Sequence, residues 1–176
     1  SRGELPLRAL TDSREHLERY LLDTADQFSG FNLVQLTTAD GWYFSNRDAH
    51  PGRQIHRGVY GLSNHLLQTP WPKLLRLRQA AGDTIAAAGR DAATLHNELI
   101  PLLQDSTPAP DHMLPDTGVG LETERFLSSP FIVGSDYGTR ATTVVTVSAS
   151  GEIEVTEQNW GPDARTGERR HFHWRR

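Results

Sequence analysis

The segment from Gly138 to Ser148 is the longest run of β-branched residues in the chain, and turn-forming residues flank it at both ends. β-branched side chains favour strands because they pack well on a pleated surface. The run therefore predicts a central strand of a sheet. Side chains alternate between the faces of a strand. One face carries Arg140, Thr142, Val144 and Thr146, and the other carries Ala141, Thr143, Val145 and Val147.

Arg140 is the one charged residue of this run. The interior of a sheet seldom holds an unpaired cation. One interpretation is a structural arginine that is bonded to a carboxylate or to loop carbonyl groups. The other is a clamp for an anion or a carbonyl group, because the guanidinium presents a rigid fork of donors. The residues alone leave both interpretations open.

Length and charge limit the classes of protein to consider. A chain of 176 residues predicts one domain, residues 1–176, with a substantial core. The net charge is -4, and the basic residues are scattered apart from a group near the end, so no nucleic-acid partner is expected. No apolar run approaches the ~20 residues of a membrane span, and no signal peptide opens the chain. We expect a soluble, cytoplasmic protein. The basic group comprises Arg169, Arg170, Arg175 and Arg176.

The order of predicted elements indicates the fold class. Helices come first, then a meander of strands, then two helices and a short helix, and finally a second meander. Such segregated runs are typical of an α+β fold with mostly antiparallel sheets. The predicted helices cover residues 1–10, 13–28, 71–88, 91–103 and 121–127, and the predicted strands cover 31–36, 42–45, 59–63, the run described above, and segments around Ile153 and Phe172.

Two polar features deserve a chemical interpretation. Asn64 follows a predicted strand, and a carboxamide there can donate its NH₂ group to a developing oxyanion, although an isolated asparagine is also a common turn or cap residue. His171 and His173 share one face of the last strand, but the sequence places no third ligand beside them, so no metal site is predicted. The chain has no cysteine, and these residues therefore supply no disulfide and no thiol nucleophile.

Seven short motifs together are similar to those of one protein family, and they occur in the family's order along nearly the whole chain. The chain resembles the NRDE family, also called the transport and Golgi organisation protein 2 family. The motifs are Ser1-Arg-Gly-Glu-Leu5, Gly30-Phe-Asn-Leu33, Trp42-Tyr-Phe-Ser-Asn46, Tyr60-Gly-Leu-Ser-Asn64, Thr69-Pro-Trp-Pro-Lys73, Leu114-Pro-Asp-Thr-Gly118 and Tyr137-Gly-Thr-Arg140.

This resemblance implies an N-terminal-nucleophile (Ntn) hydrolase-like fold, which is a four-layer α-β-β-α sandwich. Family members open with Met-Cys and soon carry an Asn-Arg-Asp-Glu motif, and neither is present here. The resemblance thus implies that the chain is the C-terminal part of such a domain, with the N-terminal strands missing. The exposed sheet edge would pair with that missing segment or with another chain.

The resemblance also implies a function for two residues. In related Ntn hydrolases the terminal cysteine attacks an amide carbonyl, and an asparagine and a later arginine complete the site. By resemblance, Asn64 would be the oxyanion donor and Arg140 the orienting arginine. The intact protein would hydrolyse a small amide or thioester and would need no cofactor. The alternative is a non-catalytic carrier or trafficking protein for haem or an acyl-CoA-like amphipathic ligand.

Overall fold

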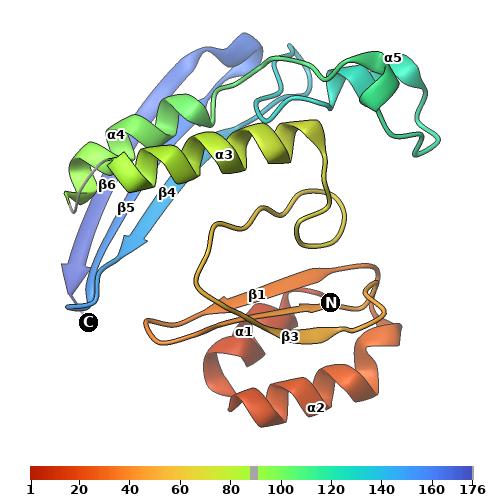
Figure 1. Ribbon diagram of the computed structural model, residues 1–176, viewed down its shortest axis with the longest axis vertical. Coiled ribbons are helices and arrows are strands. Elements are labelled where there is room, and N and C mark those ends of the chain that lie inside the picture. Colours follow the sequence, from red (N-terminus) through yellow and green to blue (C-terminus); the bar gives the residue numbers. More distant parts are fainter. Residues whose placement is uncertain (88–90, 176) are drawn as a thin grey trace. The chain divides into compact units, whose positions relative to one another are not determined.

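The computed structural model describes residues 1–87 and 91–175, which form two compact units, Ser1–Gln68 and Thr69–Arg176 (Figure 1). Ala88, in a predicted helix, and Arg176, in the basic group, lie outside the described residues. The described residues form five α-helices and two three-stranded antiparallel sheets. The predicted α+β class with antiparallel sheets is therefore confirmed.

The first unit is a sheet whose one face is covered by two helices (Figure 1). The strands lie in the order β1-β2-β3, and each pairs antiparallel with its neighbour. The elements are α1 (Glu4–Thr11), α2 (Arg14–Thr24), the 3-10 turn η1 (Ala25–Gln27), β1 (Asn32–Leu36), β2 (Gly41–Ser45) and β3 (Gly52–Ile55).

Alternation along the strands builds the core of this unit. Leu33, Trp42 and Phe44 are buried against the helices, where Leu17 and Leu21 are fully covered. Burying one such side chain contributes roughly 1.5–3 kcal/mol to folding, so these residues fix which face of the sheet meets α1 and α2. The sheet is thereby oriented by its sequence pattern.

The third strand is not where the sequence placed it. A strand was predicted at 59–63, but the structure has an irregular segment there and a strand at Gly52–Ile55 instead. The strand β3 pairs with β2 directly after a short turn, with Gly52 opposite Phe44. Residues 52–55 lack a run of β-branched or aromatic residues, so their pairing comes from the free edge of β2 and not from their own propensity.

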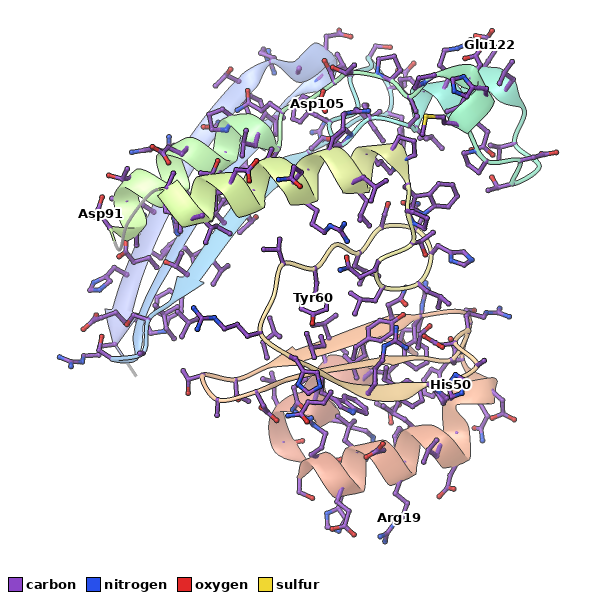
Figure 2. All side chains as sticks on the ribbon, viewed as in Figure 1. Arg19, His50, Tyr60, Asp91, Asp105 and Glu122 are labelled. Atoms are coloured by element: carbon purple, nitrogen blue, oxygen red, sulfur yellow. The ribbon has the colours of Figure 1, made fainter. Side chains whose placement is uncertain are left out.

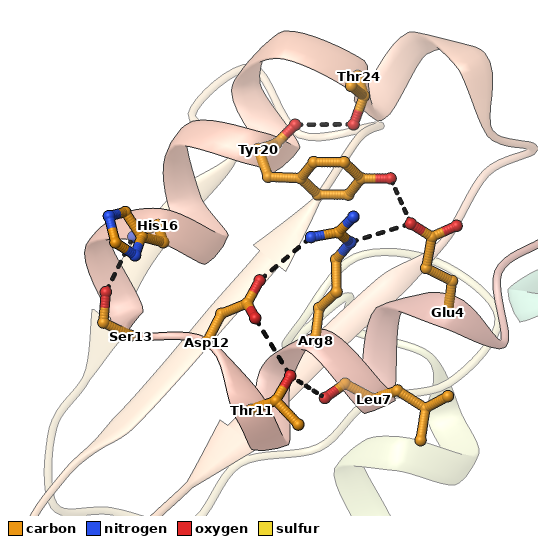
Figure 3. Close-up of polar contacts among 9 residues, drawn as sticks. All are labelled: Glu4, Leu7, Arg8, Thr11, Asp12, Ser13, His16, Tyr20 and Thr24. Carbon is orange, nitrogen blue, oxygen red and sulfur yellow. Dashed lines mark hydrogen bonds and ion pairs between the residues drawn. The ribbon is translucent and has the colours of Figure 1, made fainter.

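Polar contacts join α1 to α2 (Figure 3). Arg8 Nε contacts Glu4 Oε1 at 2.9 Å, and the Tyr20 hydroxyl donates to the same carboxylate oxygen at 2.7 Å. The Arg8 guanidinium also lies 3.8 Å from the centroid of the Tyr20 ring. The bond from Tyr20, followed by that from Arg8, lowers the pKa of Glu4. Exposed contacts of this kind add little stability but fix how the two helices lie together.

The second unit carries three helices and the other sheet (Figure 1). The helix α4 packs on β4 and β5, the first two strands of this sheet, and α3 lies beside α4. Asp91, labelled in Figure 2, caps α4 by accepting a bond from the Thr94 backbone N–H at 2.8 Å. The elements are α3 (Pro72–Ala87), α4 (Ala92–Leu102), η2 (Asp111–Met113), α5 (Leu121–Phe126), β4 (Ala141–Val147), β5 (Glu152–Trp160), η3 (Pro162–Ala164) and β6 (Thr166–Arg175).

The strand predicted to be central is an edge strand of the described sheet. The strand order is β4-β5-β6, so β5 occupies the middle and β4 pairs with β5 alone among the described residues. The predicted alternation is confirmed, because Thr142 and Val144 are buried while Val145 and Val147 are exposed. The strand propensity of a segment indicates that its side chains suit a pleated surface. It does not indicate whether the strand is central or at an edge of the sheet.

A histidine is buried between α4 and the sheet of the second unit. His96 on α4 is only 1% exposed, and each ring nitrogen meets a threonine hydroxyl. Nδ1 lies 2.8 Å from Thr156 Oγ1, and Nε2 lies 3.1 Å from Thr146 Oγ1. A neutral imidazole offers one donor and one acceptor, which suits two hydroxyl partners. The polar layer is therefore satisfied without a charge.

The pKa of His96 is lowered mainly by burial. Glu154 on β5 acts against this effect, while His171 and Arg169 on β6 add to it. The folded protein thus binds a proton at His96 less readily than the unfolded chain, whose histidines have a pKa of about 6.5. Protonation therefore favours the unfolded state, so this stability is present above about pH 6.5 and is lost as the pH falls toward the lower folded-state pKa.

We expect the urea midpoint of unfolding to decrease from pH 7.5 to pH 5, and to decrease less in His96→Gln, which removes the titrating group. A tenfold difference in proton affinity between the folded and unfolded states corresponds to about 1.4 kcal/mol. Val145→Ala, at an exposed position on β4 with a side chain that does not titrate, is the control and should keep the pH dependence of the parent. An unchanged pH dependence in His96→Gln would contradict the assignment.

Candidate functional site

Arg140 lies immediately before β4, and its backbone is fixed while its side chain is exposed. The Trp160 backbone N–H donates to the Arg140 carbonyl at 2.8 Å, and this bond continues the β4–β5 ladder. Among the described residues no carboxylate lies within ion-pair distance of the Arg140 guanidinium, in contrast with Arg76, whose Nη2 lies 3.1 Å from Asp105 Oδ2. The structure therefore offers no carboxylate partner, among the described residues, for the interpretation of Arg140 as half of a structural ion pair.

The segment that precedes Arg140 is a loop closed on itself, residues 132–139. The Thr139 N–H donates to the Ile132 carbonyl at 2.9 Å, and the Ile132 N–H donates to Thr139 Oγ1 at 3.0 Å. A Cβ atom at Gly134 would lie 2.6 Å from the Tyr137 carbonyl oxygen, and one at Gly138 would lie 2.8 Å from the Ile132 carbonyl oxygen. Both approaches are too close for any side chain, so the two glycines permit the closure that sets where Arg140 emerges.

A small cavity lies between this loop and the segment that contains Gly161 and Ala164. Its volume is about 10 Å³, roughly the room that one water molecule needs. Arg140 is among the residues that line it. A substrate does not fit in this volume, so a ligand of Arg140 would meet the guanidinium at the surface.

Asn64 lies in an irregular segment of the first unit and not at the end of a strand. Its side chain is exposed, and its Oδ1 accepts a bond from the Ser63 hydroxyl at 3.0 Å. With Oδ1 engaged, the NH₂ group is the part of the carboxamide suited to donate to a ligand. Asn64 belongs to the first unit and Arg140 to the second. Their convergence on one ligand stays a prediction.

The sequence pattern gave no indication of the residues that hold Asn64 in place. Residues 61–68, which we call the Asn64 loop, are closed at their ends: the Gln68 N–H donates to the Gly61 carbonyl, and the Gly61 N–H donates to Gln68 Oε1, both at 2.8 Å. Side chains of β1 and β2 contact the interior of the loop. A polar or aromatic residue in a strand is usually a packing residue, and only the folded sheet shows that Asn32 and Tyr43 reach the loop.

A second hollow lies beside the start of β1. It has a volume of about 360 Å³, and mainly apolar side chains surround it, with the Arg2 guanidinium bonded to the Gly30 carbonyl at 3.0 Å. Among the described residues β1 pairs only with β2, so its other edge is open. The volume is in the range of small-ligand sites, and it adjoins an edge that can accept a further strand. The lining residues are Arg2, Leu5, Pro6, Gly30, Phe31, Asn32 and Leu33.

The two histidines of β6 have acidic neighbours that were not evident in the sequence. His173 Nε2 lies 2.8 Å from Glu152 Oε2, and His171 Nε2 lies 3.6 Å from Glu154 Oε2. The antiparallel pairing of β5 with β6 brings these residues together from distant positions in the chain. Within residues 1–87 and 91–175, no group of three or more His, Asp or Glu side chains could hold a metal ion. No helix of the described chain is both long and apolar enough to cross a bilayer.

Gly134→Ala tests whether closure of the 132–139 loop is needed for the fold of the second unit. The new Cβ atom would meet backbone, which cannot move aside, so we expect a loss of about 1–3 kcal/mol in the free energy of unfolding. Gly161→Ala is the control, since the nearest atom to a Cβ there is Arg165 Nε at 3.2 Å, in a flexible side chain that can move aside. Urea unfolding of both variants makes the comparison, and equal midpoints would show that the loop can open without cost.

Comparison with known proteins places the chain in a family. The family model described as "Transport and Golgi organisation 2" matches residues 1–162. The transport and Golgi organization protein 2 homologues of Homo sapiens, Bos taurus and Mus musculus are 34%, 32% and 29% identical over 173 residues. Each match covers 90% of this chain and 61% of the relative, so the chain spans about three-fifths of the length of these relatives. The chain belongs to the Transport and Golgi organisation 2 family.

Proposed function

We propose that the intact protein hydrolyses a small amide or thioester, with Asn64 as oxyanion donor and Arg140 as the residue that orients the substrate. The observation that supports this most directly is the state of Arg140, an exposed guanidinium without a carboxylate partner among the described residues, on a backbone held by Trp160. A guanidinium held in this way is available to bind a carboxylate or carbonyl group of a ligand through two parallel hydrogen bonds.

The nucleophile of this proposed reaction comes from outside these 176 residues, which contain no cysteine. The thiolate would form a bond to the carbonyl carbon, the leaving amine or thiol would depart with a proton, and water would then cleave the acyl-enzyme and restore the thiol. The described part of the chain would position the substrate and stabilise the charge on its oxygen. Donors fixed in advance are suited to that task because they need no reorganisation as the charge develops.

We propose that the open edge of β1 accepts the strand that brings the missing part of the site, either from the same protein or from another chain. The support is an antiparallel sheet with an unpaired edge strand and a hollow of about 360 Å³ beside it. An open edge presents a row of unpaired backbone groups, and pairing satisfies them. The greater length of the relatives is consistent with a further segment.

A second candidate function is the carriage of an amphipathic ligand, such as haem or an acyl-CoA, without turnover. The observation that favours it is the outer face of the second sheet, which carries two rows of apolar side chains across the three strands. Val155 lies between Val145 and Phe172 in one row, and Ile153 lies between Val147 and Trp174 in the other. Val145, Val147 and both aromatic side chains are exposed. Exposed apolar side chains in adjacent rows are suited to an apolar ligand. The cytoplasmic location that we expect from the sequence is a separate prediction.

Asn64→Ala and Arg140→Lys, made in the intact protein, test the proposed site. Loss of an oxyanion donor typically lowers kcat 10²–10³-fold, which corresponds to about 3 kcal/mol. Lysine keeps the charge of arginine but loses its fork, so Arg140→Lys should raise KM or lower kcat at least tenfold, the loss of about 1.4 kcal/mol. Turnover of a panel of amides and thioesters, with detection of the acyl-enzyme by mass spectrometry, measures both effects.

Arg170→Lys on β6 and Asn97→Ala on α4 are the matched controls, since the proposed reaction assigns no role to either residue. Melting temperatures of all four variants separate loss of function from loss of fold. If both site variants keep full turnover per folded molecule, the proposed roles are wrong. Tight one-to-one binding of haem or an acyl-CoA without turnover would support the carrier instead.

A further inference from the structure

The Asn64 loop is attached to the sheet of the first unit by side chains of two neighbouring strands. On β1, Asn32 Nδ2 donates to the His65 carbonyl at 3.0 Å, next to Asn64 in the chain. On β2, the Tyr43 hydroxyl accepts a bond from the Leu67 backbone N–H at 3.2 Å. The two strands therefore hold the loop at two points on the C-terminal side of Asn64.

The same two side chains are bonded to each other. The Tyr43 hydroxyl donates to Asn32 Oδ1 at 2.6 Å, which leaves the Asn32 NH₂ group directed to the loop. The Tyr43 hydroxyl and the Asn32 carboxamide thus each donate one bond and accept one. The bonds form a chain that starts at the loop, passes through Tyr43 and Asn32, and returns to the loop. Coupled bonds of this kind strengthen one another and favour a single arrangement.

Tyr43 is placed firmly enough to act as a support. Its side chain is fully buried, with 0% exposure, and the Arg53 guanidinium lies 4.7 Å from the centroid of its ring. Its backbone is paired on both sides, with Val34 of β1 and Arg53 of β3. The loop itself has no regular secondary structure, so its conformation depends on contacts of this kind.

We propose that Asn32 and Tyr43 are positioning residues that set the conformation of the Asn64 loop and thereby the direction in which the Asn64 carboxamide points. The significance of that direction rests on the proposed function, in which Asn64 donates to the substrate oxygen. A donor of this kind has to stand within a few tenths of an ångström of its place, and residues that bear on it indirectly can then affect the chemistry. Neither residue touches the substrate in this scheme.

Tyr43→Phe tests the proposal, because it keeps the buried ring and removes both hydroxyl bonds. The readout is hydrogen exchange at the Gln68 amide, which closes the loop by bonding to Gly61 and makes no bond to Tyr43. We expect exchange at Gln68 to accelerate about tenfold, together with a shift of the Asn64 side-chain NH₂ signals in the ¹⁵N spectrum. Asn32→Ala, at an exposed strand position, should have the same effect with less risk to folding.

Tyr20→Phe is the matched control. It removes a hydroxyl that donates to Glu4 at 2.7 Å in the same unit, but it leaves the Asn64 loop untouched. Faster Gln68 exchange and shifted Asn64 signals in Tyr43→Phe and Asn32→Ala, but not in Tyr20→Phe, support the proposal. The proposal is overturned if Gln68 exchange and the Asn64 signals in Tyr43→Phe and Asn32→Ala equal those in Tyr20→Phe.

The readout involves no ligand, so it separates this proposal from the proposed function. If the loop loosens as expected and Asn64→Ala still turns over substrate normally, the function assigned to Asn64 is wrong while its positioning stands. If the loop is unaffected and Asn64→Ala is inactive, the function stands and the positioning role of Asn32 and Tyr43 is wrong. If the function of Asn64 and the positioning role of Tyr43 are both correct, Tyr43→Phe in the intact protein lowers kcat more than it raises KM, since the loss affects the geometry of the transition state.

Discussion

Antiparallel strand pairing is the interaction on which both units depend, because it fixes which side chains share a face and which distant residues become neighbours. In the first unit it places Leu33 and Phe44 against the helices while Asn32 and Tyr43 point to the other face. In the second it places Thr146 and Thr156 beneath His96. A shift of one residue in register would exchange these faces, so the same pairing that builds the cores also places the polar groups.

The sequence predicted the elements whose local signals agree with their tertiary environment. Ser13 and Asp91 cap α2 and α4, and the β-branched run around Val144 forms a strand with the expected alternation. The third strand of the first sheet was missed because residues 52–55 become a strand through pairing with β2. The edge position of β4 was missed because propensity does not encode the order of strands.

The candidate site shows a similar division. A lone Arg140 in a run of small hydroxyl and apolar residues was evident from the sequence, as was a carboxamide near the end of an apolar segment. What fixes them was not evident. Arg140 is set by closure of the 132–139 loop, which needs glycine at 134 and 138, and Asn64 is set by side chains 21 and 32 positions earlier in the chain. Long-range contacts of this kind follow from the fold and leave no local pattern.

The motifs of the family divide into residues that stabilise the units and residues that do not. Asn46 satisfies three backbone groups, since it donates to the Ala25 and Phe28 carbonyls and accepts from the Phe31 N–H. Lys73 donates to the Leu127 carbonyl at 2.9 Å, at the C-terminal end of α5.

Asn64 and Arg140 end two other motifs and differ from these residues. Within the part of the chain that the structure describes, the Asn64 side chain hydrogen-bonds to the neighbouring Ser63 alone, and the Arg140 guanidinium makes no ion pair. A polar side chain without hydrogen-bond acceptors in the fold keeps its donors available, whereas Asn46 and Lys73 donate to backbone carbonyl groups. The difference in hydrogen bonding, more than the identity of the residues, is what singles out Asn64 and Arg140 as candidates for contact with a ligand.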